Sequence, residues 1–87
     1  MKVIITAKCH TYLQDKLREG GYEVIYAPTI TYEELALQIE DVAGLVVSTR
    51  IKIDAGLLEH AKKMIWIGRL GSGLELIDVP FAESKGI

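Results

Sequence analysis

The chain has 87 residues, and its 10 Lys and Arg against 12 Asp and Glu give a formal net charge of −2. A chain of this length forms one small domain at most, because it buries only about 60–65% of the surface that its unfolded form exposes. No stretch gathers basic residues with aromatic ones, so we expect no nucleic acid as a partner. Its apolar runs are much shorter than the roughly 20 residues of a membrane-spanning helix, and the apolar start is too short for a signal peptide, so we expect no membrane partner.

The chain has a single cysteine, Cys9. One cysteine forms no internal disulfide, so we expect a reducing, cytoplasmic setting. The His, Cys, Asp and Glu residues do not have the spacing of a metal site, and no metal is expected.

Strand-like and helix-like segments alternate along the chain, which is typical of an α/β fold. Residues 3–7 read as a buried strand and residues 11–19 as a helix that a glycine pair ends. Residues 24–27 read as the second strand. The spacing of Thr31 and Glu34 predicts a capping box at the start of the second helix, in which each side chain bonds the other residue's backbone N–H.

The second half of the chain predicts two further strand and helix pairs. Residues 44–48 are the most continuously apolar segment, as expected for a central strand of a parallel sheet that helices cover on both faces. Asp54 is the expected N-cap of a helix that holds Leu57, Leu58 and Ala61. Residues 64–68 read as the fourth strand, and Asp78 caps the last helix.

These elements predict a flavodoxin-like parallel sheet with strand order 2-1-3-4 and helices on both faces. After the last helix stops near Lys85 and Gly86, only Ile87 remains where an α/β chain normally supplies another strand. We therefore expect residues 1–87 to be a single domain that is truncated before a fifth strand. An open edge of this kind pairs with a partner strand or with a second copy, so a homodimer through the edge is one expectation.

Ligands gather at the carboxyl ends of the strands of such a sheet, where the loops 8–10, 49–53 and 69–75 are expected to meet. In the second loop, Thr49, Arg50 and Lys52 supply a hydroxyl and two cations that suit a carboxylate or phosphate, although a solvated turn is equally consistent with their spacing.

The third loop contains Gly71 and Gly73 just before the last helix. It is not a dinucleotide fingerprint, because Leu76 occupies the third glycine position and the loop follows the fourth strand. The backbone N–H groups of such a tight loop suit a small carboxylate, and Arg69 is a candidate to assist.

Two blocks of the sequence together resemble one enzyme family. These blocks are GLVVSTRIKI at 44–53 and, after a helix, IGRLGSGLELID at 67–78 followed by AESKGI at 82–87. They resemble the N-terminal region of the D-isomer-specific 2-hydroxyacid dehydrogenases, with the phosphoglycerate dehydrogenase branch as the nearest match. The resemblance implies the larger part of a flavodoxin-like substrate domain, which a Rossmann domain that binds NAD interrupts in that family.

The resemblance also implies roles for single residues. Backbone N–H groups of Gly71, Ser72 and Gly73 would receive the substrate carboxylate, and Ser72 would also lie close to the nicotinamide. The loop from Ser48 to Lys52, which includes Thr49 and Arg50, would line the same cleft. The chain has Ser48-Thr49 where the phosphoglycerate branch commonly has Arg-Ser, and Leu76 where an asparagine is usual. The resemblance therefore leaves open whether the substrate is phosphorylated.

The chemistry that the resemblance implies is hydride transfer between nicotinamide and a D-2-hydroxy or 2-oxo acid. The family's catalytic histidine, glutamate and arginine lie beyond residue 87, so no catalytic residue is expected in this chain and the chain alone should be inactive. NADP is not excluded as the cofactor. The alternative is a stand-alone flavodoxin-like binding or dimerisation module without catalysis.

Overall fold

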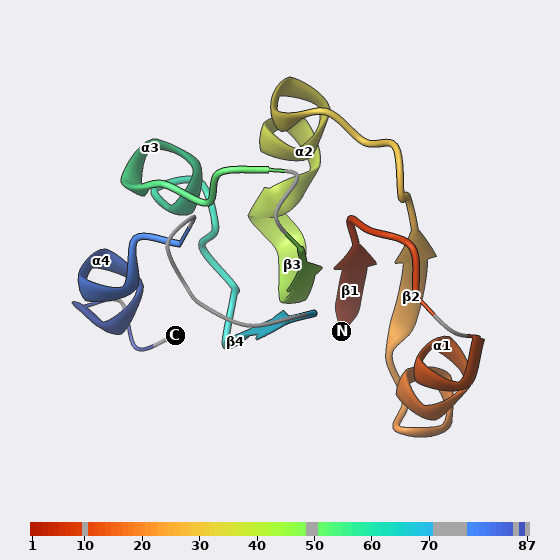
Figure 1. Cartoon of the computed structure of the whole chain (residues 1–87). Helices are drawn as coiled ribbons and strands as arrows, with labels where there is room; N and C mark the ends of the chain where they lie inside the picture. Colours follow the sequence, from red (N-terminus) through yellow and green to blue (C-terminus); the bar gives the residue numbers. More distant parts are fainter. Residues whose placement is uncertain (10, 49–50, 71–76, 85, 87) are drawn as a thin grey trace.

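The computed structural model describes residues 1–9, 11–48, 51–70, 77–84 and 86. Within these residues the chain forms a four-stranded parallel sheet in the order β2-β1-β3-β4 (Figure 1), which confirms the predicted strand order. The elements, in chain order, are β1 (Lys2–Ile5), α1 (Thr11–Glu19), β2 (Glu23–Tyr26), α2 (Tyr32–Gln38), the 3₁₀ turn η1 (Ile39–Asp41), β3 (Val42–Val47), α3 (Ala55–Leu58), β4 (Trp66–Arg69) and α4 (Val79–Ser84).

The sheet separates two hydrophobic cores, because successive side chains of a strand point to opposite faces. The first core has Val3, Ile5 and Val46 at its centre, and Leu13 and Leu17 of α1 pack against them. The second core is larger and joins the other face of the sheet to α2, α3 and α4, through buried residues that include Ile4, Leu35, Ile39, Leu45, Val47, Leu57, Leu58 and Ala82. Helices therefore cover both faces, as predicted.

Strand β3 lies between β1 and β4, and its six residues are all buried. This is the arrangement that its uninterrupted apolar sequence predicts, because a strand between two others and under two cores has no solvent-facing side. Strands β2 and β4 are the two edges of the described sheet.

The helix starts follow the predicted capping residues. The Thr31 hydroxyl accepts a hydrogen bond from Glu34 N–H at 3.2 Å, and the Glu34 carboxylate accepts one from Thr31 N–H at 3.1 Å, so the capping box is confirmed. Asp78 caps α4 by accepting a hydrogen bond from the N–H of Phe81 at 3.1 Å. Helix α1 ends at the glycine pair, where Gly21 has a φ of 92°, a left-handed conformation that glycine adopts without steric cost.

Helix α3 is shorter than the sequence predicts. Asp54 is its N-cap, as expected, but the helix ends at Leu58 instead of continuing past Ala61. After Glu59 the hydrogen bonds tighten from i→i−4 to i→i−3, with His60 N–H donating to Leu57 O and Ala61 N–H to Leu58 O. Ala61 is nevertheless buried, so its apolar character reflects tertiary packing and not a longer helix.

The ring of Trp66 lies on the face of the sheet that α1 covers, over the backbone of the neighbouring strand β3. A Cβ atom added to Gly44 would be only 2.2 Å from Trp66 Cζ2 and 2.3 Å from Cε2. The indole packs edge-on to Tyr22, with ring centroids 6.0 Å apart, and its N–H donates to the Tyr22 hydroxyl at 3.3 Å. The absence of a side chain at Gly44 is therefore what allows the tryptophan to pack on β3.

Candidate functional site

The carboxyl ends of β1 and β3 are joined directly. Thr6, the residue after β1, donates to Val46 O through both its N–H at 2.9 Å and its hydroxyl at 3.0 Å. Thr6 is buried, and the chain then leaves the sheet through the exposed Lys8 and the half-buried Cys9, which packs against the first core. The start of the first predicted loop is thus placed next to the end of the central strand.

The loops after β3 and β4 begin next to each other and also end next to each other. At their start, Leu70 N–H donates to Val47 O at 2.8 Å. At their end, Ile53 and Ile77 form an isolated parallel bridge, and Asp78 N–H donates to Ile53 O at 2.8 Å. Ile53 is fully buried, so it anchors the end of the loop after β3 in the second core. The two loops that were predicted to share a site therefore have adjacent ends on both sides.

A hydrogen bond between two helix starts stabilises this region. The Tyr32 hydroxyl, at the beginning of α2, donates to Asp54 Oδ1 at 2.7 Å, and the same oxygen accepts from Leu57 N–H at 2.9 Å. Sequence reasoning identified Asp54 as an N-cap but did not find Tyr32 as its second partner, because the two residues are 22 positions apart. The pair fixes the end of the loop after β3 relative to α2.

This hydrogen bond lowers the pKa of Asp54 and raises the pKa of Tyr32. The hydrogen bond from Tyr32 is the main reason why the pKa of Asp54 lies below its usual value of 3.8. The hydrogen bond to Asp54, followed by desolvation, raises the pKa of Tyr32 from 10.0 to about 12. Both shifts favour the pair of protonated phenol and ionised carboxylate, so the bond stabilises the fold at neutral pH.

We expect Tyr32→Phe to lower the free energy of unfolding at neutral pH by about 1 kcal/mol, the usual net value of a hydrogen bond. The difference in the free energy of unfolding between wild type and variant should shrink at both low and high pH. Below about pH 4 the lowered pKa of Asp54 means that the stabilisation is lost as the carboxylate protonates, and it is lost again as pH rises from 10.0 to about 12 and the phenol ionises. Urea unfolding at several pH values checks this, with Tyr26→Phe as the matched control. A pH-independent difference would contradict the role of the Asp54 bond.

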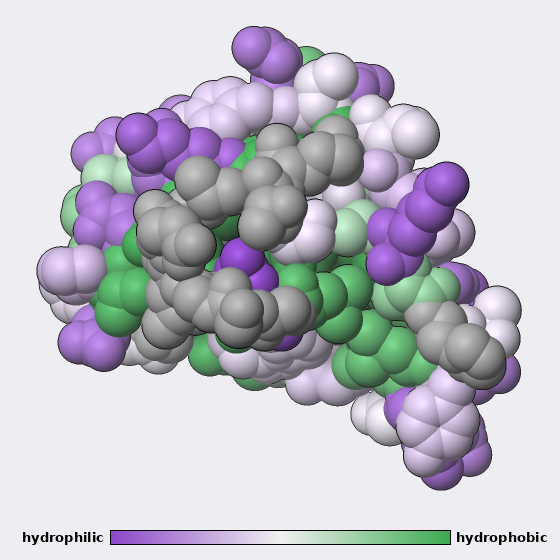
Figure 2. All heavy atoms as spheres, viewed as in Figure 1, coloured by the Kyte–Doolittle hydropathy of each residue, from purple (hydrophilic) through white to green (hydrophobic). Residues whose placement is uncertain are grey.

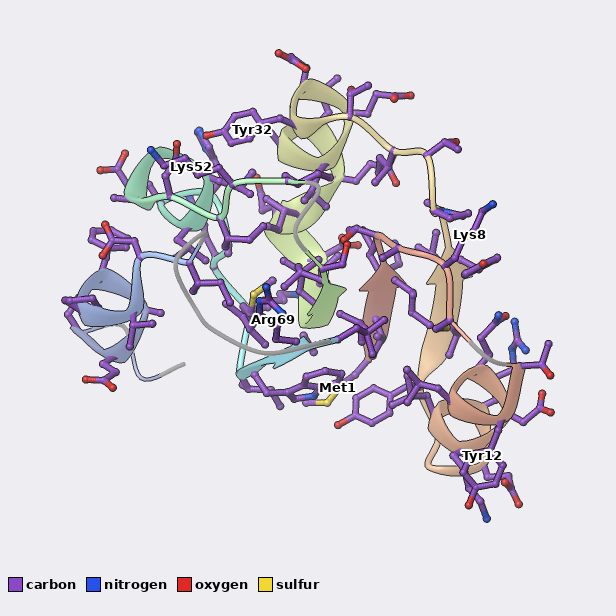
Figure 3. The ribbon with its side chains drawn as sticks, in the orientation of Figure 1. Met1, Lys8, Tyr12, Tyr32, Lys52 and Arg69 are labelled. Atoms are coloured by element: carbon purple, nitrogen blue, oxygen red, sulfur yellow. The ribbon has the colours of Figure 1, made fainter. Side chains whose placement is uncertain are left out.

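Arg69 lies nearer to the middle of the molecule than the other two cations that Figure 3 labels. Figure 3 shows it near the middle of the molecule, whereas Lys8 and Lys52 lie towards the periphery. Arg69 is half-buried, and its Nη1 donates to Leu70 O at 3.1 Å. Within the described part of the chain, its buried Nε has no hydrogen-bond partner and no ion pair involves Arg69. A guanidinium in this state has unused capacity to bind an anion.

The structure describes one of the six predicted site residues, Arg69, which follows the end of the predicted fourth strand and lies on β4. The other five lie outside the described residues: Thr49, Arg50, Gly71, Ser72 and Gly73. Among the residues that are described, no group of three or more His, Cys, Asp and Glu side chains is arranged to hold a metal ion. The described helices also include none of the length and apolar character that crossing a membrane requires.

Hydrophobic and hydrophilic surface are mixed on the side of the molecule that Figure 2 shows, with purple hydrophilic side chains spread around the outline and green patches between them. Among the described residues, the large hydrophobic side chains that are exposed come from separate parts of the chain, namely Met1, Tyr12, Tyr26, Leu37 and Ile65. Apart from Ile65, which lies beside the edge strand β4, they do not mark one common site.

Sequence comparison finds relatives over the whole chain. The D-3-phosphoglycerate dehydrogenase of Methanocaldococcus jannaschii is 39% identical over 87 residues, which is 100% of this chain and 16% of the relative. The D-3-phosphoglycerate dehydrogenase of Sus scrofa is 31% identical over 86 residues, 99% of this chain and again 16% of the relative. The chain therefore spans about one sixth of the length of these relatives.

Solved structures share the fold. The TT0316 protein from Thermus thermophilus superposes with a TM-score of 0.90 at 29% identity, covering 100% of this chain and 29% of that protein. An NAD⁺-bound 3-phosphoglycerate dehydrogenase from Entamoeba histolytica has a TM-score of 0.85 at 23% identity, which shows the likeness of fold, and the match covers 31% of that protein.

The match to a family model agrees with the resemblance carried by residues 44–53 and 67–78. The model of the D-isomer specific 2-hydroxyacid dehydrogenase catalytic domain matches residues 3–87. This range includes all four strands except Lys2, the first residue of β1, and both loops whose ends lie side by side. The chain belongs to the D-isomer specific 2-hydroxyacid dehydrogenase family.

Proposed function

We propose that residues 1–87 are the N-terminal part of the substrate domain of an NAD-dependent oxidoreductase that transfers a hydride between nicotinamide and a D-2-hydroxy or 2-oxo acid. Membership of the family supports the chemistry. The share of about 16% of each relative supports the view that the chain is one segment of a larger enzyme. The order of the strands supports a flavodoxin-like domain that a fifth strand would complete.

The observation that carries the substrate assignment is the state of Arg69. Among the described residues the Nε of this half-buried guanidinium has no partner, and a charge that loses hydration on burial is costly unless an anion compensates it. The carboxylate of a 2-hydroxy or 2-oxo acid would supply that anion through charge-assisted hydrogen bonds. Beside it, the backbone N–H groups of Gly71, Ser72 and Gly73 and the side chains of Thr49 and Arg50 are the proposed further contacts.

The cofactor is assigned mainly to the rest of the enzyme. In this proposal a Rossmann domain outside residues 1–87 binds NAD, and it also decides between NAD and NADP. The cofactor accepts or delivers the hydride when it is bound. This chain contributes Ser72 near the nicotinamide, and it binds and orients the substrate carboxylate through Arg69 and the glycine loop. The reducing, cytoplasmic location that the lone Cys9 suggests is part of the same proposal.

We expect the isolated 87-residue chain to oxidise no NADH with any 2-oxo acid. The acid–base residues that the proposed reaction needs would lie in the remainder of the enzyme. Absorbance at the NADH wavelength, with a panel of 2-oxo acids of different side chains, measures this. Turnover that copurifies with the chain and disappears on Arg69→Leu would contradict the proposal that the chain is only a substrate-binding segment.

A second candidate role, dimerisation, is favoured by the position of β4 at the edge of the described sheet. We propose that the chain on its own pairs two copies through this edge, since an open strand presents free backbone donors and acceptors. Size-exclusion chromatography with light scattering across a range of concentrations should give a mass that rises toward that of a dimer. A constant monomer mass at high concentration would remove this role.

A further inference from the structure

The hydroxyl of Tyr32 binds a carboxylate at the point where the loop after β3 ends. It donates to Asp54 Oδ1 at 2.7 Å, and Figure 3 shows the tyrosine ring extending from the start of α2 toward α3 and Lys52. Both partners are half-buried, so water competes less for this hydrogen bond than for one on the surface. Because the same oxygen accepts from Leu57 N–H at 2.9 Å, two elements fix the orientation of the carboxylate.

The residue before Asp54 connects this contact to the loop after β4. Ile53 O accepts a hydrogen bond from Asp78 N–H at 2.8 Å, and Ile53 forms the parallel bridge with Ile77. Ile53 is fully buried, whereas Ile77 and Asp78 are half-buried. Through two adjacent residues, Ile53 and Asp54, the Tyr32 hydroxyl is therefore connected to the ends of both loops that the proposed substrate site uses.

The starts of three helices meet through these bonds. Tyr32 is the first residue of α2, Asp54 is the N-cap of α3, and Asp78 caps α4. Helix α3 has 4 residues and α4 has 6, and helices this short have little stability of their own. Helix α2 has a complete capping box and buries Leu35 in the second core. Tyr32 thus extends from a well-fixed helix start to two helices that depend on tertiary contacts.

We propose that Tyr32 is a positioning residue for the substrate. By binding Asp54 it orders the ends of the loops after β3 and β4, and so increases the affinity of the site for the substrate carboxylate. The inference rests on the proposed function and extends it to a side chain that does not itself contact the substrate. Without the hydroxyl, the loop ends would populate further arrangements, and the substrate would bind only the fraction of molecules with the competent one.

Steady-state kinetics of the full-length protein test the effect on affinity. Tyr32→Phe should raise KM for the 2-oxo acid about 3- to 10-fold, the range that the loss of one hydrogen bond allows, and leave kcat and the KM for NADH nearly unchanged. A variant that only unfolds more readily would contain less active protein, which lowers kcat and leaves KM unchanged. Tyr26→Phe is the matched control, because Tyr26 is 40% exposed on the edge strand β2, and it should change neither constant.

Variants of Asp54 show whether the hydroxyl acts through this carboxylate. Asp54→Asn keeps Oδ1 as the acceptor for both donors, so KM for the 2-oxo acid should stay near that of wild type. Asp54→Ala removes the acceptor and should raise KM at least as much as Tyr32→Phe does. In the double variant Tyr32→Phe/Asp54→Ala, loss of the hydroxyl should raise KM no further, because its partner is already absent.

Hydrogen exchange of single amides in the 87-residue chain tests the ordering of the loop ends without any activity. Tyr32→Phe should accelerate exchange of Asp78 N–H about 3- to 10-fold, because its acceptor, Ile53 O, adjoins Asp54. Leu70 N–H, which donates to Val47 O where the same loops begin, is the reference and should exchange at nearly the wild-type rate. A general loss of stability would accelerate both amides alike.

Three results would overturn the proposal, each at a different step. Unchanged exchange at Asp78, or equal acceleration at Asp78 and Leu70, would show that Tyr32 does not order the loop ends. Faster exchange at Asp78 alone, with an unchanged KM for the 2-oxo acid, would remove the role in substrate affinity. A full-length protein that turns over no 2-oxo acid would overturn the proposed function and the substrate role with it, while the exchange at Asp78 still decides whether Tyr32 orders the loop ends.

Discussion

On the proposed function, replacing Arg69 by leucine in the full-length protein is expected to lower kcat/KM for a 2-oxo acid by roughly 30- to 700-fold. A charge-assisted contact to a substrate carboxylate in a partly buried site is worth about 2–4 kcal/mol, and each 1.4 kcal/mol changes the rate constant tenfold. Arg69→Lys keeps the charge but loses the planar fork of donors, so it should recover only part of the activity. Steady-state kinetics with NADH and the 2-oxo acid measure both variants.

The same substitution should not destabilise the fold. The buried Nε of Arg69 has no hydrogen-bond partner among the described residues, so leucine removes no contact of this atom that the structure describes. Equal or higher free energy of unfolding, together with lost activity, would separate substrate binding from folding. Arg18→Leu on α1 is the matched control, because the interaction that the structure gives Arg18 is an exposed ion pair with Asp15 at 3.7 Å. If Arg69→Leu retains kcat/KM within threefold of wild type, Arg69 does not bind the substrate.

Of the glycines that the structure describes, Gly44 is the one at which we expect alanine to be most destabilising. The added Cβ would lie 2.2 Å from Trp66 Cζ2, so the indole must leave its place on β3 and give up its hydrogen bond to Tyr22. Overpacking of a core costs about 1–3 kcal/mol and occasionally more. This is a large share of the roughly 5–15 kcal/mol that stabilises a small domain. Urea unfolding followed by far-ultraviolet circular dichroism measures the loss.

Two variants establish that the indole is the cause. Gly20→Ala is the matched glycine control, because its Cβ would lie 3.5 Å from the nearest atom, an ordinary contact. In the double variant Gly44→Ala/Trp66→Leu, the smaller leucine side chain should relieve the clash, so the two effects should not add. Strict additivity would show that the cost of alanine at Gly44 arises elsewhere.

The helix starts are predictable from the sequence because they depend on local chemistry, and the strand order is predictable because general rules restrict the connections between parallel strands. Thr31 and Glu34 satisfy each other within four consecutive residues, and the run of apolar residues in β3 requires cover on both faces. The length of α3 is not predictable in this way. Ala61 has the spacing of a helical core residue, but it reaches the core through tight turns after Glu59. The spacing of Ala61 in the sequence reflects its burial, and both a longer helix and the observed turns bury this residue.

The contacts that hold the site are harder to predict, because their partners are distant in the sequence. The Tyr32 hydroxyl reaches Asp54 across 22 positions, and Trp66 covers Gly44 on the next strand. A tyrosine next to a capping threonine carries no signal of a distant carboxylate. The sequence predicted Arg69 from its position after a strand, but it could not predict that the Nε atom is buried without a partner among the described residues.

The central claim is that this chain is the substrate-domain segment of a larger dehydrogenase. The most direct test is NADH oxidation by the purified full-length product of the reading frame, assayed with a panel of 2-oxo acids beside the 87-residue chain. We predict turnover of at least one 2-oxo acid by the full-length protein and none by the 87-residue chain. A full-length product that binds no nicotinamide cofactor and reduces none of the acids would contradict the claim.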